Sequence, residues 1–509
     1  MKKPSGNLWR ISAWTIVVLA TLTALFYAVE NWRGARAWEE VRSKLESEGE
    51  PLTLSDLEID PVGPNDNFCA IPLIASVYEF EQVRTTDADV FGDSEIRYHH
   101  PEDRERFLTM RLPETSSGEM PEPELPTGGG THEEVNWDAW IEFLSRADSF
   151  ALGNAEGAAP ERILAGFDSH RTLLGDLAEA ARDRGEAKMP FELGESFPEM
   201  AGALLPHLND FREFSKFLSL RANAALAADR TEVALESLHI QIRVAEAVGS
   251  QPTLINHLVQ MMIVRQAVGT VGHGLGLGVW SANDLERLEQ ILGGVDLEAS
   301  RLRAFRMERI FFLAGVRYME SEPGAMSDLL AMVETTGGHG PSWLMFRFLP
   351  SGWFDQNAAL GAVAMEKSGI GPLKRGDLSP SSRKTLQGML KAPYPYSFLC
   401  RLSLPAVDQV LVRSLHIEAE LDFCRIACAL KLHRREHGSY PPDLAALVPE
   451  FLDTLPEDLV APDGYRYRTA DDGYRLYSVG WDGVDDGGER GRDEDGSPNR
   501  RTGDWVWGM

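Results

Sequence analysis

The chain has 509 residues, and its 43% hydrophobic and 25% charged residues are typical of a folded protein with roughly two to four domains. Its formal net charge of -28 at pH 7 would repel a phosphate backbone, and no stripe of basic and aromatic residues offsets it, so we expect no nucleic-acid partner. The four cysteines are too few for a disulfide framework and lack zinc-site spacing. Cys424 and Cys428 lie one helical turn apart, which favours packing in a core over a redox role.

An apolar segment near the N-terminus predicts a membrane anchor. Residues 11–29 carry no charge and are long enough to cross the hydrocarbon core as a helix. Aromatic residues suited to the headgroup region lie toward both ends: Trp9, Trp14, Tyr27 and Trp32. A cleavable signal peptide is the alternative, but bulky residues interrupt the small ones at 24–30, so an uncleaved anchor is favoured. A modest charge bias predicts that residues 1–10 are a cytoplasmic tail and that the body lies outside the cytoplasm, on a single-pass protein of the inner (cytoplasmic) membrane.

The region after the anchor changes character twice. Residues 30–50 have apolar side chains at helical spacing and predict a helical stalk. Residues 51–135 form a mixed region, in which 113–130 is rich in proline and glycine and predicts a flexible linker or exposed loop.

Residues 136–400 predict a helical body made of successive amphipathic hairpins. Thr231 is expected to cap a helix that ends at Gly249, and Ser281 with Asp284 is a capping-box variant that opens another helix. The run 218–248 resembles one tetratricopeptide-like helical pair, which implies a groove for a protein partner. No further copies follow in register, so a plain bundle is favoured over a solenoid.

Three segments of the body have patterns found in functional sites, but for each of them we favour a structural interpretation. The glycine-rich run 272–278 predicts a loop between helices, because it follows a helix and Leu277 replaces the last glycine of a phosphate-binding fingerprint. The aromatic-rich segment 341–354 is expected in the core, since it lacks the basic face of a membrane-surface helix. The string 381–384 matches S-x-x-K, but no supporting element accompanies it.

The sharpest catalytic string is H-x-x-E-H at residues 433–437. His433 and His437 could share a metal ion on one helix face, and Glu436 could activate its bound water, as in a metal-dependent hydrolase. However, Gly438 predicts that the helix ends there, basic residues suit a helix C-terminus, and no third ligand is identifiable. A charged helix terminus is therefore the favoured interpretation.

Residues 401–509 give the most specific pattern in the chain. A helix from about Pro405 to His437 is followed by two strand-like runs, 465–468 and 474–478, each preceded by an Asp-Gly turn. This region resembles the globular domain of the major type II secretion pseudopilin. The residues that carry the resemblance are 429–433, 437–441, 463–467 and 474–483. The resemblance implies a small α+β domain.

The same resemblance implies a calcium ion in the loop after the last long strand, with ligands at Asp482 and Asp504. Asp485 and Asp486 are nearby oxygen donors, and Asp493 and Asp495 are further candidates. A solvated acidic loop is the alternative, because arginines intervene at positions 490, 492, 500 and 501.

The chain departs from the pseudopilin pattern at its N-terminus. Gly6 is followed by Asn7, and the fifth position after it is Ile11 where the family has glutamate, so polymerisation into a pseudopilus is not implied. We therefore predict a mostly α envelope protein with a transmembrane helix, a helical bundle and a C-terminal α+β domain. We expect it to bind or scaffold unidentified protein partners, with a secretion-related role and no catalysis; the alternative is the hydrolase described above.

Overall fold

The structure is a computed structural model of the chain, and it is mostly helical with small sheets near the C-terminus. It describes residues 6–57, 63–84, 94–113, 121–128, 134–146, 150, 152, 157–191, 193–194, 196–203, 205–322, 348–374, 378, 393–470 and 473–508. Residues 341–347 of the aromatic-rich segment, the S-x-x-K string at 381–384 and parts of the linker 113–130 lie outside the described residues. In the described half of the aromatic-rich segment Phe354 is buried, as predicted, whereas Phe348 is exposed.

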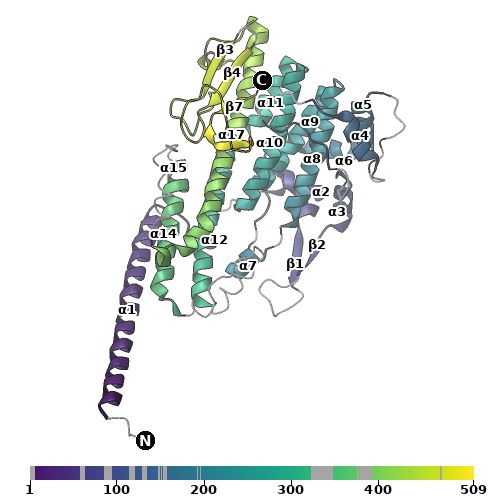
Figure 1. Cartoon of the computed structure of the whole chain (residues 1–509). Helices are drawn as coiled ribbons and strands as arrows, with labels where there is room; N and C mark the ends of the chain where they lie inside the picture. Colours follow the sequence, from purple (N-terminus) through teal and green to yellow (C-terminus); the bar gives the residue numbers. More distant parts are fainter. Residues whose placement is uncertain are drawn as a thin grey trace.

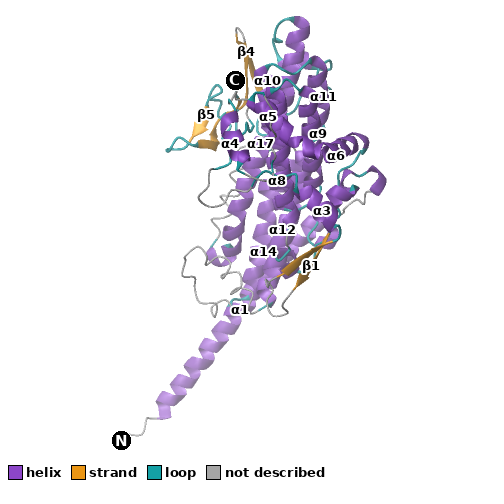
Figure 2. Cartoon of the chain, turned by 90° about the vertical axis from the view of Figure 1, so that its right-hand side faces the viewer, coloured by secondary structure: helices purple, strands orange, loops and turns teal. Residues whose placement is uncertain are grey.

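The N-terminal helix α1 runs without a break from Gly6 to Ser47, so the predicted anchor and stalk form one helix. Its apolar part is exposed, and the helix is long and apolar enough to cross a membrane. Figures 1 and 2 show that α1 projects away from the body and that the C-terminal strands lie at the opposite end of the molecule. Most of the apolar part of α1 therefore projects from the body, and contacts with the body begin at Phe26, whose ring meets Trp353, and at Tyr27, whose hydroxyl donates to the Phe348 carbonyl.

Helix α14, Ser351–Met365, packs against α1 and joins it to the body. Gly34 and Gly352 face each other, and a Cβ atom on Gly34 would lie 2.1 Å from the carbonyl oxygen of Gly352. Trp353 donates its indole N–H to the buried Glu30 carboxylate over 2.9 Å, and Gly352 N–H donates to Asn31. Only glycine permits this close approach of the two backbones, so the crossing point is fixed by residue size.

The end of the stalk is fastened by a buried carboxylate. Glu50 accepts hydrogen bonds from Arg306 at 2.7 Å, Arg309 at 2.6 Å and Lys374 at 2.9 Å. The Glu50 and Arg309 side chains are fully buried, and Arg309 also pairs with Glu366 at 3.1 Å. The stalk, helix α12 and helix α15 therefore meet at one charge cluster.

The successive helices α8 to α12 are joined by short connections and form the centre of the body, with α8, α9 and α10 packed against one another (Figures 1 and 2). The bounds of the helices of the body are α2 Pro72–Tyr78, α3 Pro101–Leu108, α4 Trp137–Ser145, α5 Ala159–Gly166, α6 Arg171–Asp183, α7 Phe197–Ala201, α8 Pro206–Ala227, α9 Thr231–Gly249, α10 Leu254–Leu277, α11 Ala282–Gly293, α12 Leu297–Ser321 and α15 Gly371–Lys374. The strands β1 Phe80–Arg84 and β2 Ser94–Tyr98 form an antiparallel pair beside them.

Two local predictions for the body are wrong, and one is confirmed. Thr231 does not cap α9: it is the first helical residue, and its neighbour Arg230 occupies the cap position without a side-chain hydrogen bond. The run 272–277 is not a loop but the last turns of α10, where Gly274 leaves room for the Trp280 indole. The capping box of Ser281 and Asp284 is present, with the Asp284 N–H donating to Ser281 at 3.2 Å.

A 40-residue helix, α17, runs from Phe398 to His437 and links the body to the C-terminal strands. It begins seven residues before the predicted start and contains Pro405, while its end at Gly438, in the left-handed conformation, is as predicted. In the body α17 packs against α10, α11, α12 and α14. Its upper part carries the strands β3 Arg466–Ala470, β4 Gly473–Ser478, β5 Arg490–Arg492, β6 Pro498–Gly503 and β7 Trp505–Trp507.

The C-terminal strands form two small antiparallel sheets. The strand order β3-β4-β7 makes one sheet, with Arg466 opposite Tyr477 and Leu476 opposite Trp507. The pair β5-β6 makes the other. The two strand-like runs predicted from the sequence are thus β3 and β4, and the third strand, β7, was not predicted.

Candidate binding sites

Two polar contacts join the C-terminal domain to α17, one from Tyr465 just before β3 and one from Arg501 of β6. The hydroxyl of Tyr465 donates to Asp422 at 2.7 Å, and burial raises the pKa of the Asp422 carboxyl to about 8. Arg501 donates to Asp408 at 2.6 Å. The acidic loop between β4 and β5 therefore has a rigid base.

Two of the aspartates predicted as calcium ligands hold this loop by accepting backbone N–H groups. Asp504 is 2% exposed and accepts from Gly488 at 2.6 Å and from Asp486 at 3.3 Å. Asp482 accepts from Val484 and from Gly503, each at 3.0 Å. These bonds join the two sides of the loop, so both side chains have a structural role whether or not a metal binds.

The other two predicted ligands lie on the exposed side of the loop. Asp485 accepts from Gly487 at 3.0 Å and from the hydroxyl of Tyr477 at 3.1 Å, and the Gly487 bond is the main cause that lowers its pKa. Burial raises the pKa of Asp504, and the charges of Asp485 and Asp486 raise it further. The carboxylate oxygens of this loop are therefore ligands of the kind that calcium prefers. Their negative charges repel one another, and a bound cation would reduce that repulsion.

These carboxylates are gathered in one loop, but they are not assembled into a cage. Within the described part of the chain, no group of three His, Cys, Asp or Glu side chains is placed to hold a metal ion. The predicted calcium site stays a prediction.

The H-x-x-E-H string lies at the exposed end of α17. The rings of His433 and His437 stack with their centroids 4.3 Å apart, and both contact Phe451. Nδ1 of His433 donates to the carbonyl of Ser439 at 2.9 Å, while Glu436 is exposed. Stacked rings on an exposed helix end, with no third ligand among the residues described, match the expected helix terminus.

All four cysteines are buried and free. Burial raises the pKa of the Cys400 thiol to about 12 and raises that of Cys424 as well. Cys424 and Cys428 lie on the face of α17 that packs under the sheet, where they fill space in the core. This agrees with the packing role expected from their spacing.

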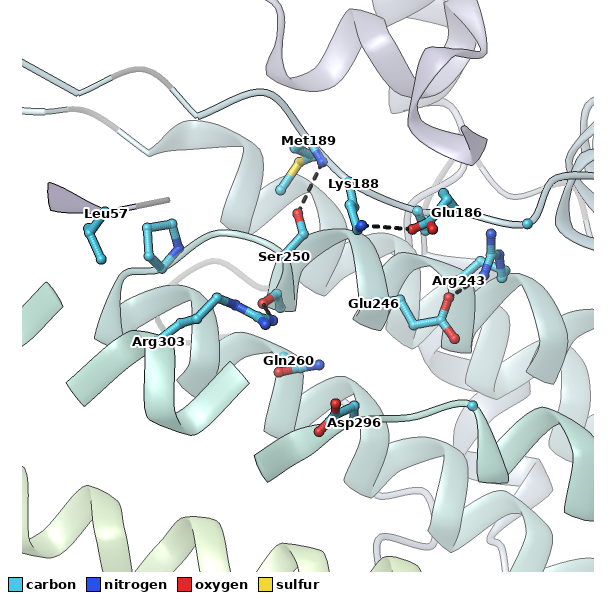
Figure 3. Close-up of a pocket in the computed structure, with 15 residues that line it drawn as sticks. Leu57, Glu186, Lys188, Met189, Arg243, Glu246, Ser250, Gln260, Asp296 and Arg303 are labelled. Atoms are coloured by element: carbon cyan, nitrogen blue, oxygen red, sulfur yellow. Dashed lines mark hydrogen bonds and ion pairs between the residues drawn. The ribbon is translucent and has the colours of Figure 1, made fainter. Parts of the chain in front are cut away.

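The body contains a second candidate site, a cavity of about 490 Å³ that sequence reasoning did not find (Figure 3). Its walls are the extended segment 185–189, the C-terminal end of α9 with the turn that follows, Gln260 of α10, and the start of α12 from Asp296 to Arg303. The extended segment is fixed because Met189 N–H donates to Ser250 Oγ at 3.0 Å and Gln251 donates to the Met189 carbonyl at 2.7 Å.

The floor of this cavity depends on a glycine. A Cβ atom on Gly249 would lie 2.1 to 2.4 Å from the side-chain amide of Gln260, so only glycine leaves space for that amide. Gln260 is 2% exposed, and its Oε1 has no hydrogen-bond partner among the described residues. The Nε atoms of Arg243 and Arg303 are likewise buried without a partner there. An unpaired buried polar atom costs about 1 to 3 kcal/mol, so a polar occupant would stabilise this site.

The charges around the cavity are balanced. Arg243 pairs with Glu246, Lys188 pairs with Glu186 at 3.1 Å, and Arg303 donates from one Nη to the Gly249 carbonyl at 3.0 Å. The carboxylate of Asp296 caps α12 by accepting the Ala299 N–H at 2.8 Å. Burial lowers the pKa of Arg303, and the Asp296 charge acts in the opposite direction.

Comparison of the chain with protein-family models, with curated proteins and with solved structures gives no match. The resemblance of residues 401–509 to the pseudopilin domain therefore stays a prediction from the sequence.

Proposed function

We propose that this protein is a membrane-anchored binding or scaffolding protein that presents its C-terminal domain at a fixed distance from the membrane. The observation that carries the proposal is the unbroken series of packed helices between the anchor and the C-terminal sheet. Helix α1 packs on α14, α14 packs on α17, and α17 carries the strands (Figure 1).

Each joint in this series is built from specific contacts. The α1–α14 joint is the glycine crossing of Gly34 and Gly352. At the α14–α17 joint, Asn357 is fully buried, accepts the Leu399 N–H at 3.0 Å and donates to the Pro395 carbonyl at 3.1 Å. Helix α17, at 40 residues, is about 60 Å long, which sets the reach of the scaffold.

The charge bias of the N-terminal segment supports a body on the extracytoplasmic side of the inner membrane. The secretion-related role in this proposal rests on the pseudopilin-like pattern of residues 401–509.

The scaffold is tested by measuring how rigidly the two ends are joined. Spin labels at Glu40→Cys and Glu450→Cys, both exposed positions, would report the distance by pulsed electron resonance on full-length protein in nanodiscs. We expect a narrow distribution that broadens in Gly352→Leu but not in Gly175→Leu, whose Cβ position meets open space. A broad distribution in the parent protein, or an unchanged one in Gly352→Leu, would refute the scaffold.

Calcium stabilisation of the acidic loop is the second part of the proposal. Calorimetric titration of the full-length protein in detergent micelles should give saturable calcium binding. Asp504→Asn should abolish it, whereas Asp453→Asn, at an exposed position of the same domain, should not. Absence of heat in the parent protein would leave the loop as solvated charge and would remove calcium from the proposal without affecting the scaffold.

A further inference from the structure

The cavity between segment 185–189 and helices α9, α10 and α12 has the features of a ligand site and no role in the scaffold. Its volume of about 490 Å³ lies within the roughly 300 to 1,000 Å³ of typical small-molecule pockets. Figure 3 shows Arg303, Gln260, Asp296 and Glu246 around one space, although they come from three different helices or their ends. The tertiary fold has therefore brought together polar groups that are far apart in the sequence.

The groups without partners define what an occupant must offer. The Nε atoms of Arg243 and Arg303 are donors and require an acceptor, for which a carboxylate is the strongest choice. Oε1 of Gln260 is an acceptor and requires an N–H donor. A purely apolar ligand would satisfy neither requirement, so the ligand carries both functions.

The balance of charges around the cavity further restricts the class of ligand. Three cationic side chains and three carboxylates line the cavity: Lys188, Arg243, Arg303, Glu186, Glu246 and Asp296. The three carboxylates would repel a polyphosphate or another multiply charged anion. The three basic groups would likewise repel a simple cation. A molecule with one negative and one positive end can place each end beside the opposite charge.

We propose that this cavity binds a small zwitterion, namely a free amino acid or a short peptide. The carboxylate lies beside Arg303, and the ammonium lies toward Gln260 and Asp296. Gln260 packs directly on Gly249, whereas the side chains of Lys188 and Glu186 are half exposed, so the ligand enters from the side of Lys188 and Glu186.

Calorimetry on the full-length protein in detergent micelles tests the proposal, with glycylglycine and L-glutamine as zwitterions and acetate and methylammonium as half-ligands. We expect saturable binding of a zwitterion that is at least about tenfold tighter than binding of either half-ligand, because each half leaves one set of buried polar atoms unpaired. Equal affinity for acetate, or no binding of either zwitterion, would overturn the proposal.

Variants separate the site from general effects on folding. Arg303→Gln should weaken zwitterion binding by at least about tenfold, whereas Arg287→Gln, an arginine outside this cavity that pairs with Glu232, should not. Gln260→Leu should lower the affinity for the zwitterion relative to acetate, and this ratio does not depend on the folded fraction. Unchanged binding in Arg303→Gln would refute the assignment of the carboxylate.

Discussion

Replacing Glu50 by glutamine should destabilise the protein more than any change on the exposed surface of the stalk. Burial alone raises the pKa of the Glu50 carboxyl, but hydrogen bonds from Arg306, Lys374 and Arg309 outweigh it and lower the pKa from 4.5 to about 2. Because each pKa unit corresponds to about 1.4 kcal/mol, the ionised carboxylate contributes about 3 kcal/mol of stability at neutral pH. Glutamine would also leave the fully buried Arg309 without its closest counter-charge.

The stability contributed by Glu50 should decrease in acid. The folded pKa lies below the unfolded pKa, so the contribution is complete above pH 4.5 and is lost as the pH falls through about 2. We expect the difference in unfolding free energy between the parent protein and Glu50→Gln to be about 3 kcal/mol at pH 7 and less than half of that at pH 3.

The assay is chemical unfolding of full-length protein in detergent micelles, followed by tryptophan fluorescence at several pH values. Glu46→Gln is the matched control, since Glu46 is exposed in the last turn of α1, four residues before Glu50, and its one ion pair among the described residues is a long contact of 3.9 Å to Arg42. Its effect should stay within about 0.5 kcal/mol. A loss below about 1 kcal/mol for Glu50→Gln at pH 7, or a loss that does not shrink in acid, would refute the reasoning.

Two further predictions concern packing. Gly274→Val should lower the unfolding free energy by about 1 to 3 kcal/mol in the same assay, because its Cβ would lie 2.3 Å from the Trp280 indole nitrogen. The control Gly175→Ala, in an open stretch of α6, should raise the unfolding free energy by about 0.5 to 1 kcal/mol. Equal effects of the two substitutions would contradict the packing of α10. The four cysteines, with raised pKa values at Cys400 and Cys424, should not react with a thiol reagent at pH 8 in the native protein and should all react after unfolding; rapid native labelling would show that their burial is wrong.

Several elements followed directly from local sequence. The anchor is visible because nineteen uncharged residues, 11–29, are a local property of the chain. The end of α17 at Gly438 and the capping box of Ser281 with Asp284 were predicted because such signals act within a few residues. The strands β3 and β4 were predicted from alternation and from the turns beside them.

Other local rules failed where distant residues decided the conformation. The glycines at 272–274 continue α10 instead of forming a loop because Trp280 packs against Gly274 and its indole N–H donates to the Val271 carbonyl at 3.1 Å. Pro405 lies inside α17 although proline removes a backbone donor, and the first turn of α17 is held on α14 by the bond from the Leu399 N–H to Asn357. Neither contact can be read from spacing along the chain.

The candidate sites divide in the same way. The acidic loop is a contiguous stretch, so the sequence pointed to Asp482, Asp485 and Asp486, and the structure added the reason why Asp504 lies beside them, namely its bonds to Asp486 and Gly488. The cavity was missed because it joins segments about a hundred residues apart, from 185–189 to Arg303. A buried glutamine at position 260, within an otherwise apolar run, was the one sequence signal that could have indicated it.

The sequence by itself determined that the chain has an apolar N-terminal segment long enough to cross a membrane, a helical body and a short C-terminal sheet, because hydrophobic periodicity, caps and turns depend on neighbouring residues. The tertiary structure alone decided where α1 crosses α14, which charges surround Glu50 and which polar atoms face the cavity. These features depend on contacts between residues from about one hundred to more than three hundred positions apart, and their free energies arise from burial and close packing that exist only in the folded chain.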